Sequence, residues 1–238
     1  MVTVENVRAR RGEMLNTLKT IVELESPSAD KAAVDRLVGH LRERIGAAGG
    51  EVEALAQSDY GDLTIARWPG KEGQKPLLVM THIDTVWPIG TLARKPFSVD
   101  EREARGPGIY DMKASVAMML QALTFLQENN VEHRPLTWLI NTEEEVGSPV
   151  SRPVIERLAT ESEYVLVLEP PVAPNGALKT ARKGVGMFTM HITGLAAHAG
   201  DDPEKGISAI QELANQIQYL HGMTDYALGT TVNVGVVS

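Results

Sequence analysis

The chain has 238 residues, and 31 Asp and Glu against 23 Lys and Arg give it a formal net charge of −8 at pH 7. This balance argues against a nucleic-acid-binding protein, because binding to a polyanion depends on clustered Lys and Arg. Cysteine is absent from the sequence, so any metal ion would have to be held by His and carboxylate side chains.

Composition also bears on where the chain acts. Hydrophobic residues make up 43% and charged residues 23% of the sequence, which is typical of a globular protein. No apolar run approaches the ~18 residues that a membrane helix needs. The first 20 residues are charged and amphipathic and lack the apolar core of a signal peptide. We therefore expect no membrane association and a cytoplasmic location.

The N-terminal part of the chain begins with helical patterns. Apolar residues at helical spacing predict a helix that ends at the turn Ser26-Pro27-Ser28. A second helix is expected from an N-cap at Asp30 to the pair Gly49-Gly50. Two short strands follow, at 51–56 and 63–68.

Three apolar runs without polar alternation come next, at 76–80, 136–140 and 164–168. Such runs predict strands that are covered on both faces. Helices are expected between them, over 112–128 and near 151–160. This alternation predicts an α/β fold with a largely parallel sheet and helices on both faces.

The pattern changes after residue 183. An alternating strand is expected at 187–193, a long helix from about Pro203 to His221, and a last strand at 230–237. We therefore predict a larger domain at 1–183 and a smaller α+β domain at 184–238. A unit of this size needs a partner or more chain to be stable.

Groups that bind metal ions follow each of the three apolar runs. His82 and Asp84 follow the first, the triplet 143–145 (Glu-Glu-Glu) follows the second and Glu169 follows the third, while Asp111 follows a Gly-rich turn. Each alone has an ordinary role, such as a surface salt bridge or a helix cap. Because ligands bind beyond the carboxyl ends of strands in an open parallel sheet, their recurrence there predicts a metal site.

The spacing of these residues suggests a different role for each group. His82 and Asp84 are two residues apart, so in extended chain they share one side, and Asp84 is placed to accept the ring N–H that faces away from a metal. Within the triplet 143–145, one carboxylate is expected to bind metal while a neighbour removes a proton from water.

Five segments, in the same order as in the family, resemble the M20 metallopeptidases, which include glutamate carboxypeptidase, aminoacylase, acetylornithine deacetylase and succinyl-diaminopimelate desuccinylase. The segments are LLVMTHIDTV (77–86), RGPGIYDMK (105–113), NTEEEVGS (141–148), VLEPP (167–171) and ITGLAAHAG (192–200). The resemblance, which is greatest to the glutamate carboxypeptidase branch, implies a zinc-exopeptidase-like catalytic domain with a smaller lid or dimerisation domain.

The resemblance also implies a ligand set. His82, Asp111 and Glu169 would bind one zinc ion, and Asp111 would bridge to a second zinc ion that Glu145 also holds. Similar ligands would accept cobalt or manganese.

Three further roles follow from the same resemblance. Glu144 would be the general base and Asp84 would orient His82. His198 would reach the active site of the neighbouring subunit in a homodimer and help to stabilise the oxyanion.

The chain departs from the family pattern in its length. Family members are considerably longer, and the last histidine of their second zinc site lies in a segment that has no counterpart here. His191 and His221 are not in matching positions, and we expect both to be structural. We therefore expect one complete zinc site and a weak or empty second one, in a fragment or a shortened product that exposes apolar surface.

Two functional hypotheses result. The first is a zinc-dependent hydrolase that cleaves an amide bond of a small peptide or an N-acyl amino acid. The second is a non-catalytic metal-binding or dimerising module, or an inactive fragment. Glu144 favours the first hypothesis, because a binding module does not need a carboxylate beside the ligands.

Overall fold

A computed structural model describes residues 3–238. The chain separates into two compact units, Met1–Lys179 and Thr180–Ser238. This division lies close to the boundary expected after residue 183.

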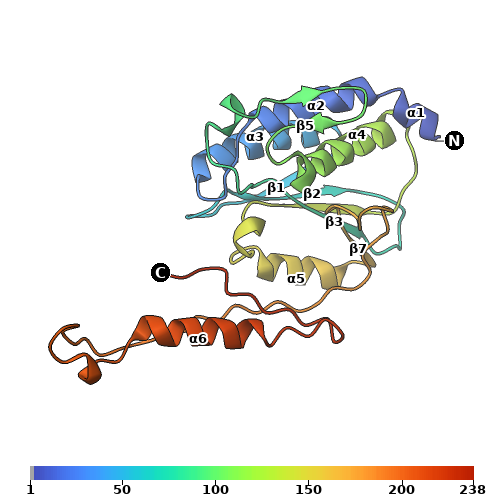
Figure 1. Cartoon of the computed structure of the whole chain (residues 1–238). Helices are drawn as coiled ribbons and strands as arrows, with labels where there is room; N and C mark the ends of the chain where they lie inside the picture. The colour runs from blue at the N-terminus through green and yellow to red at the C-terminus, as the bar shows by residue number, and fades with distance from the viewer. Residues whose placement is uncertain (1–2) are drawn as a thin grey trace. The chain divides into compact units, whose positions relative to one another are not determined.

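A five-stranded sheet forms the centre of the first unit (Figure 1). β3 runs parallel to both β6 and β7, whereas β2 is antiparallel to its neighbours β1 and β6. The sheet is therefore mixed, with its parallel strands on one side. In spatial order the strands are β1 (Glu51–Leu55), β2 (Leu63–Trp68), β6 (Leu136–Asn141), β3 (Leu77–His82) and β7 (Tyr164–Val167).

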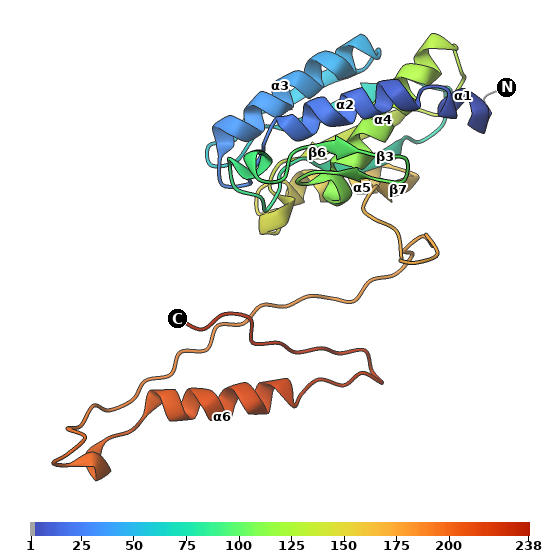
Figure 2. The same ribbon diagram turned by 45° about the horizontal axis from the view of Figure 1, so that its top comes forward.

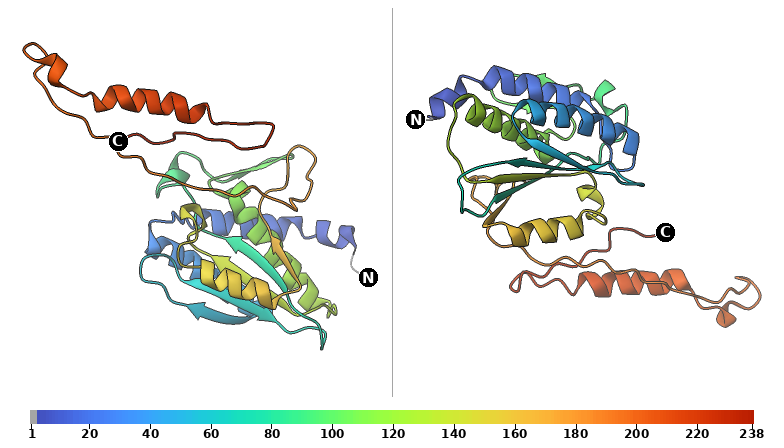
Figure 3. Two further views of the ribbon diagram at one scale, coloured as in Figure 1. Left: turned by 90° about the horizontal axis from the view of Figure 1, so that it is seen from below. Right: turned by 180° about the vertical axis from the view of Figure 1, so that it is seen from behind.

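Helices cover both faces of this sheet, as predicted. Three of them lie side by side on one face (Figure 2), namely α2 (Arg11–Glu23), α3 (Lys31–Ala47) and α4 (Ala114–Glu128). The short helix α1 (Val4–Arg8) precedes them, and α5 (Arg152–Glu161) lies across the opposite face (Figure 3). The predicted N-cap is confirmed, since the Asp30 carboxylate accepts a hydrogen bond from the Ala33 N–H.

Burial confirms two of the three apolar runs as covered strands. Every residue of β6 is buried, and β3 is buried or half-buried throughout. The prediction is wrong for β7, whose side chains are 41–60% exposed. β7 is the last strand in the sheet order, so within the described residues no further strand covers its outer edge.

Short turns and a two-stranded hairpin connect these elements. They are η1 (Thr91–Ala93), the two-stranded hairpin β4 (Ser98–Val99) and β5 (Ala104–Arg105), the kinked turn η2 (Ile109–Lys113), and η3 (Glu144–Val146). The helix expected from residue 112 therefore begins two residues later, because the backbone at 111 and 112 is not helical.

The second unit contains a single long helix, α6 (Ala209–His221), which is capped by the Ser208 hydroxyl. The helix begins later than predicted, because Pro203–Lys205 forms a separate turn, η4, and Gly206 is extended. The strands expected at 187–193 and 230–237 are wrong. In this unit the structure has only isolated bridges, Leu195 to Ile207 and Asp225 to Thr230, since the extended segments have no adjacent strand to form a ladder with.

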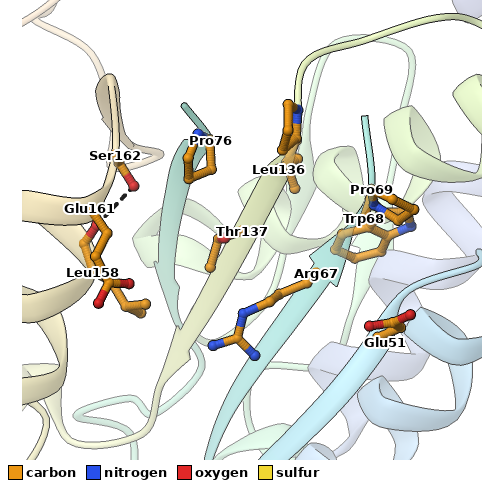
Figure 4. Close-up of a pocket in the computed structure, with 11 residues that line it drawn as sticks. Glu51, Arg67, Trp68, Pro69, Pro76, Leu136, Thr137, Leu158, Glu161 and Ser162 are labelled. Atoms are coloured by element: carbon orange, nitrogen blue, oxygen red, sulfur yellow. Dashed lines mark hydrogen bonds between the residues drawn. The ribbon is translucent and has the colours of Figure 1, made fainter. Parts of the chain in front are cut away.

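Over residues 3–238, no helix has both the length and the apolar character required to cross a membrane. A cavity of about 330 Å³ lies between α5 and the sheet (Figure 4). Pro76 and Leu136 line it at the beginnings of β3 and β6. The cavity thus lies at the opposite end of the strands from His82 and includes none of the predicted site residues.

Candidate metal centre

The end of β3 and three loops bring the predicted ligands to the carboxyl ends of the parallel strands. His82 is the last residue of β3 and lies opposite Asn141, the last residue of β6. Glu144 and Glu145 follow in η3, Glu169 lies two residues beyond β7, and Asp111 lies in η2. The parallel register therefore gathers residues that are far apart in the sequence, as predicted.

The His82 imidazole is the centre of this cluster. Its Nε2 atom lies 2.9 Å from Asp111 Oδ1, 3.3 Å from Glu169 Oε1 and 3.9 Å from Glu144 Oε2. The ring itself is almost fully buried. One nitrogen with three carboxylates around it is a donor set that suits a divalent cation such as zinc.

Two groups of three ligand atoms are compact enough to hold an ion, with all atoms within 4.8 Å of one another. One group is His82, Asp111 and Glu145, and the other is His82, Glu144 and Glu169. The structure thus brings together the four predicted ligands and the predicted base. The division of these residues between ions stays a prediction, and the resemblance divides them differently.

Asp84 occupies the other side of the imidazole. His82 Nδ1 lies 3.1 Å from the Asp84 main-chain oxygen and 3.4 Å from its Oδ1 atom. Asp84 is fully buried, so it does not form a surface salt bridge. Its carboxylate also accepts the N–H groups of Glu144 and Glu145, each at 3.2 Å. One buried carboxylate therefore connects the histidine to the acidic loop.

The electrostatics of the site favour a cation. Burial by itself lowers the pKa of His82. Hydrogen bonds to Asp84 and Glu169 outweigh this effect and raise the pKa to about 11. Burial raises the pKa of Glu144, and the nearby charges of Glu169, Asp84 and Asp111 add to this effect against the opposing influence of His82. Such crowding of carboxylates is relieved by positive charge at Nε2, either a proton or a metal ion.

A glycine brings the Asp111 turn close to the sheet. Gly108 has φ +69°, and a Cβ atom there would lie 2.6 Å from Thr85 Cγ2. A side chain at 108 would therefore push the turn away from the residues that follow β3. The glycine thus allows Asp111 to approach the strand ends. Met112 strengthens the approach, since its sulfur accepts the His82 N–H at 3.3 Å.

Residue patterns did not reveal three of the groups that build the site. Glu143 is fully buried, and its Oε1 atom accepts the Ser151 N–H at 2.6 Å, so it anchors the loop instead of facing the ligands. Ser28 donates to Asp84, and Lys113 donates to a main-chain oxygen. In the sequence, Glu143 is indistinguishable from its two acidic neighbours, while Ser28 lies in a segment that only predicted a helix end.

His198 belongs to the second unit and is exposed. Its Nδ1 atom accepts the N–H groups of Gly200 and Asp201, each at 3.1 Å. These local bonds fix the ring within its own turn. A role for His198 in a neighbouring subunit stays a prediction.

Fold and site together define an α/β protein with a histidine and carboxylate centre at the carboxyl ends of its parallel strands. The model of peptidase family M20/M25/M40 matches residues 78–231. The chain belongs to this peptidase family.

Curated relatives agree with this membership. Carboxypeptidase G2 of Pseudomonas sp. (strain RS-16) is 33% identical over 223 residues, which cover 92% of this chain and 54% of the relative. Acetylornithine deacetylase of Proteus mirabilis (strain HI4320) is 30% identical over 160 residues, covering 64% of this chain and 39% of the relative. The chain thus spans about half the length of carboxypeptidase G2, and the match covers a smaller share, 39%, of the length of the deacetylase.

Solved structures share the fold at lower sequence identity. A tripeptidase from Staphylococcus aureus subsp. aureus Mu50 matches with a TM-score of 0.67 and 18% identity, covering 88% of this chain and 56% of that one. The M20 family metallo-carboxypeptidase Sso-CP2 from Sulfolobus solfataricus matches with a TM-score of 0.58 and 21% identity, covering 69% and 39%.

Proposed function

We propose that the chain carries the catalytic centre of a zinc-dependent hydrolase that cleaves an amide bond of a small peptide or an N-acyl amino acid. The observation that carries this proposal is the convergence of Asp111, Glu144 and Glu169 on His82 Nε2. Membership of a peptidase family and the similarity to a carboxypeptidase and a deacetylase support the reaction class.

In this proposal His82, Asp111 and Glu169 hold one zinc ion, and Asp111 and Glu145 contribute to a weaker second site. When bound, the metal supplies a Lewis acid that polarises the scissile carbonyl and lowers the pKa of water. Cobalt or manganese would suit the same oxygen and nitrogen ligands.

Glu144 supplies the proton chemistry. Its carboxylate removes a proton from the attacking water and donates that proton to the leaving amine. Burial raises its pKa, which makes the carboxylate a stronger base than that of an exposed glutamate and so favours the first step. Asp84 keeps the His82 ring oriented. Its carboxylate also accepts a hydrogen bond from the Glu144 N–H, which holds Glu144 beside that ring. His198 of a neighbouring subunit would then help to stabilise the oxyanion.

A chelation experiment tests the proposal. The purified chain is measured for bound zinc and for hydrolysis of a panel of dipeptides and acyl-glutamates, before and after treatment with a chelator. We expect turnover that is lost on chelation and restored by added zinc. Bound zinc without turnover on any substrate would instead favour a non-catalytic metal-binding or dimerising module.

We also propose that the second unit associates with its counterpart in another copy of the chain. Val185, Met187 and Phe188 are more than 90% exposed in the described unit, and exposed apolar clusters mark association surfaces. Light scattering coupled to size exclusion tests this, with Phe188→Ser expected to shift a dimer towards the monomer. An unchanged dimer would place the interface elsewhere.

A further inference from the structure

The segment Leu24–Ser28 follows α2 directly, and its residue pattern predicts nothing more than the end of that helix. In the structure it contacts two loops of the metal centre, the loop after β3, which carries Asp84, and η2, which carries Asp111. Further along the connection after β3, the Glu25 carboxylate accepts the N–H groups of Gly90 and Leu92 at 2.8 and 2.9 Å.

The contacts with the His82 loop are made by two serines. Ser26 Oγ donates to the Ile83 main-chain oxygen at 2.6 Å, and Ser28 Oγ donates to Asp84 Oδ2 at 2.7 Å. The main chain adds a short parallel bridge, in which Thr85 N donates to Ser26 O at 2.8 Å and Ser28 N donates to Thr85 O at 3.2 Å. All of these serine and aspartate side chains are buried. The residue that orients the imidazole is thus itself held by Ser28.

The contact with the Asp111 turn is made by Lys113. Its side chain is buried, and its ammonium donates to the Leu24 main-chain oxygen at 2.8 Å. The Glu25 carboxylate attracts the same ammonium. At its other end, Lys113 N donates to the Gly108 oxygen at 2.9 Å, which closes the turn around Asp111. Because Lys113 is buried, its contacts with the Leu24 oxygen and the Glu25 carboxylate connect the Asp111 turn to the Leu24–Ser28 segment.

We propose that the segment Leu24–Ser28 sets the distance between His82 and Asp111, with Ser28 and Lys113 as positioning residues for metal binding. Neither residue contacts the ion position. Ser28 acts through Asp84, and Lys113 acts through the turn that carries Asp111. This inference rests on the proposed metal centre and adds to it the two residues that align its ligand loops.

The test compares zinc affinity in three variants of the segment's contacts and in two control variants. In Ser28→Ala and Lys113→Met, zinc dissociation constants are measured by competition with a chelator of known affinity. We expect binding about 10–100-fold weaker in each, which is the usual effect of losing an outer partner of a metal ligand. Ser28→Thr, which keeps the hydroxyl, should restore most of the affinity.

Two control variants remove comparable bonds elsewhere. Ser162 Oγ donates to the Leu158 main-chain oxygen at 2.8 Å, and Arg42 donates to the Leu63 oxygen at 3.0 Å. Ser162→Ala and Arg42→Met should leave the zinc dissociation constant unchanged. Unfolding in the presence of chelator is measured for all variants, because a merely structural role would lower stability there without changing zinc affinity.

The outcomes separate the two proposals. If the wild-type chain binds zinc and both Ser28→Ala and Lys113→Met bind it equally tightly, the positioning role is wrong and the metal centre stands. If the folded wild-type chain does not bind zinc, both proposals are overturned. If Lys113→Met does not fold, Ser28→Ala against Ser28→Thr decides the question alone.

Discussion

His82 Nε2 and Asp111 Oδ1 lie 2.9 Å apart, although one residue ends a central strand and the other lies in a turn before α4. The contact joins a strand end and a distant turn at one point, with Glu169 Oε1 only 3.3 Å from the same nitrogen. Substitutions can show what this convergence does and what maintains it.

Replacing His82 by Ala should abolish the metal centre. Loss of an outer partner costs about 10–100-fold in metal affinity, so loss of the imidazole that both ligand groups share should cost more than about 100-fold. Chelator competition measures the effect. His133→Ala is the control, because His133 hydrogen-bonds to Arg134 far from the site. Unchanged zinc binding in His82→Ala would contradict the proposed centre.

Glu144→Gln should separate binding from catalysis. The amide keeps the shape of the side chain but cannot remove a proton from water, so kcat should fall about 10²- to 10⁴-fold. Zinc content, measured on the same sample, should stay close to that of the wild type. A variant with nearly normal turnover would show that another group acts as the base.

Gly108→Ala should destabilise the chain and displace the Asp111 turn. A left-handed backbone costs an alanine about 1–2 kcal/mol, and contact of its Cβ with Thr85 adds about 1–3 kcal/mol of overpacking. Gly73→Ala is the matched control, since Gly73 has φ +79° with no atom within 4 Å of an added Cβ. Urea unfolding should show the larger loss at 108. Equal losses at both positions would mean that the contact with Thr85 adds nothing to the loss of stability at position 108.

Acidification should remove the contribution of one ion pair to stability. Lys31 lowers the pKa of Asp62, helped by the Gln57 N–H and against the effect of burial. A carboxyl with a lowered folded pKa stabilises above its unfolded pKa of about 3.9 and loses this contribution as pH falls through its folded pKa. Asp62→Asn should therefore cost about 0.5–1 kcal/mol at pH 7, and this cost should disappear once the pH has fallen below the lowered folded pKa. A difference that persists in acid would contradict the ion pair as its source.

A charge on the exposed edge strand should reduce association. Leu166 in β7 is 47% exposed on a strand whose outer edge is unpaired within the described residues, and edge lysines discourage strand pairing. We expect Leu166→Lys to lower concentration-dependent light scattering. Val7→Lys, at a similarly exposed position on α1, should have little effect. Equal scattering in both variants would argue against the edge as the contact.

Local rules predicted most of the first unit. Asp30 caps its helix, the apolar runs form β3 and β6, and strand ends deliver His82 and Glu169 to one point. These features depend on short-range chemistry and on the direction of parallel strands. The bounds at 112 and 203 were wrong because irregular turns precede both helices.

Long-range context explains the remainder. The side chains of 187–193 alternate as in a strand, but a ladder needs a neighbour that the described chain does not place there. Residues such as Ser28 and Lys113 matter through single hydrogen bonds to loops distant in sequence. Such bonds leave no periodic pattern, so only coordinates reveal them.

The Asp84 carboxylate links the orientation of the His82 imidazole to the position of the acidic loop. Because the same group faces the imidazole and accepts the N–H groups of Glu144 and Glu145, the ring and the acidic loop are fastened to a common anchor. Displacing Asp84 would therefore move both groups, so the spacing between the ring and the acidic loop depends on a single buried side chain.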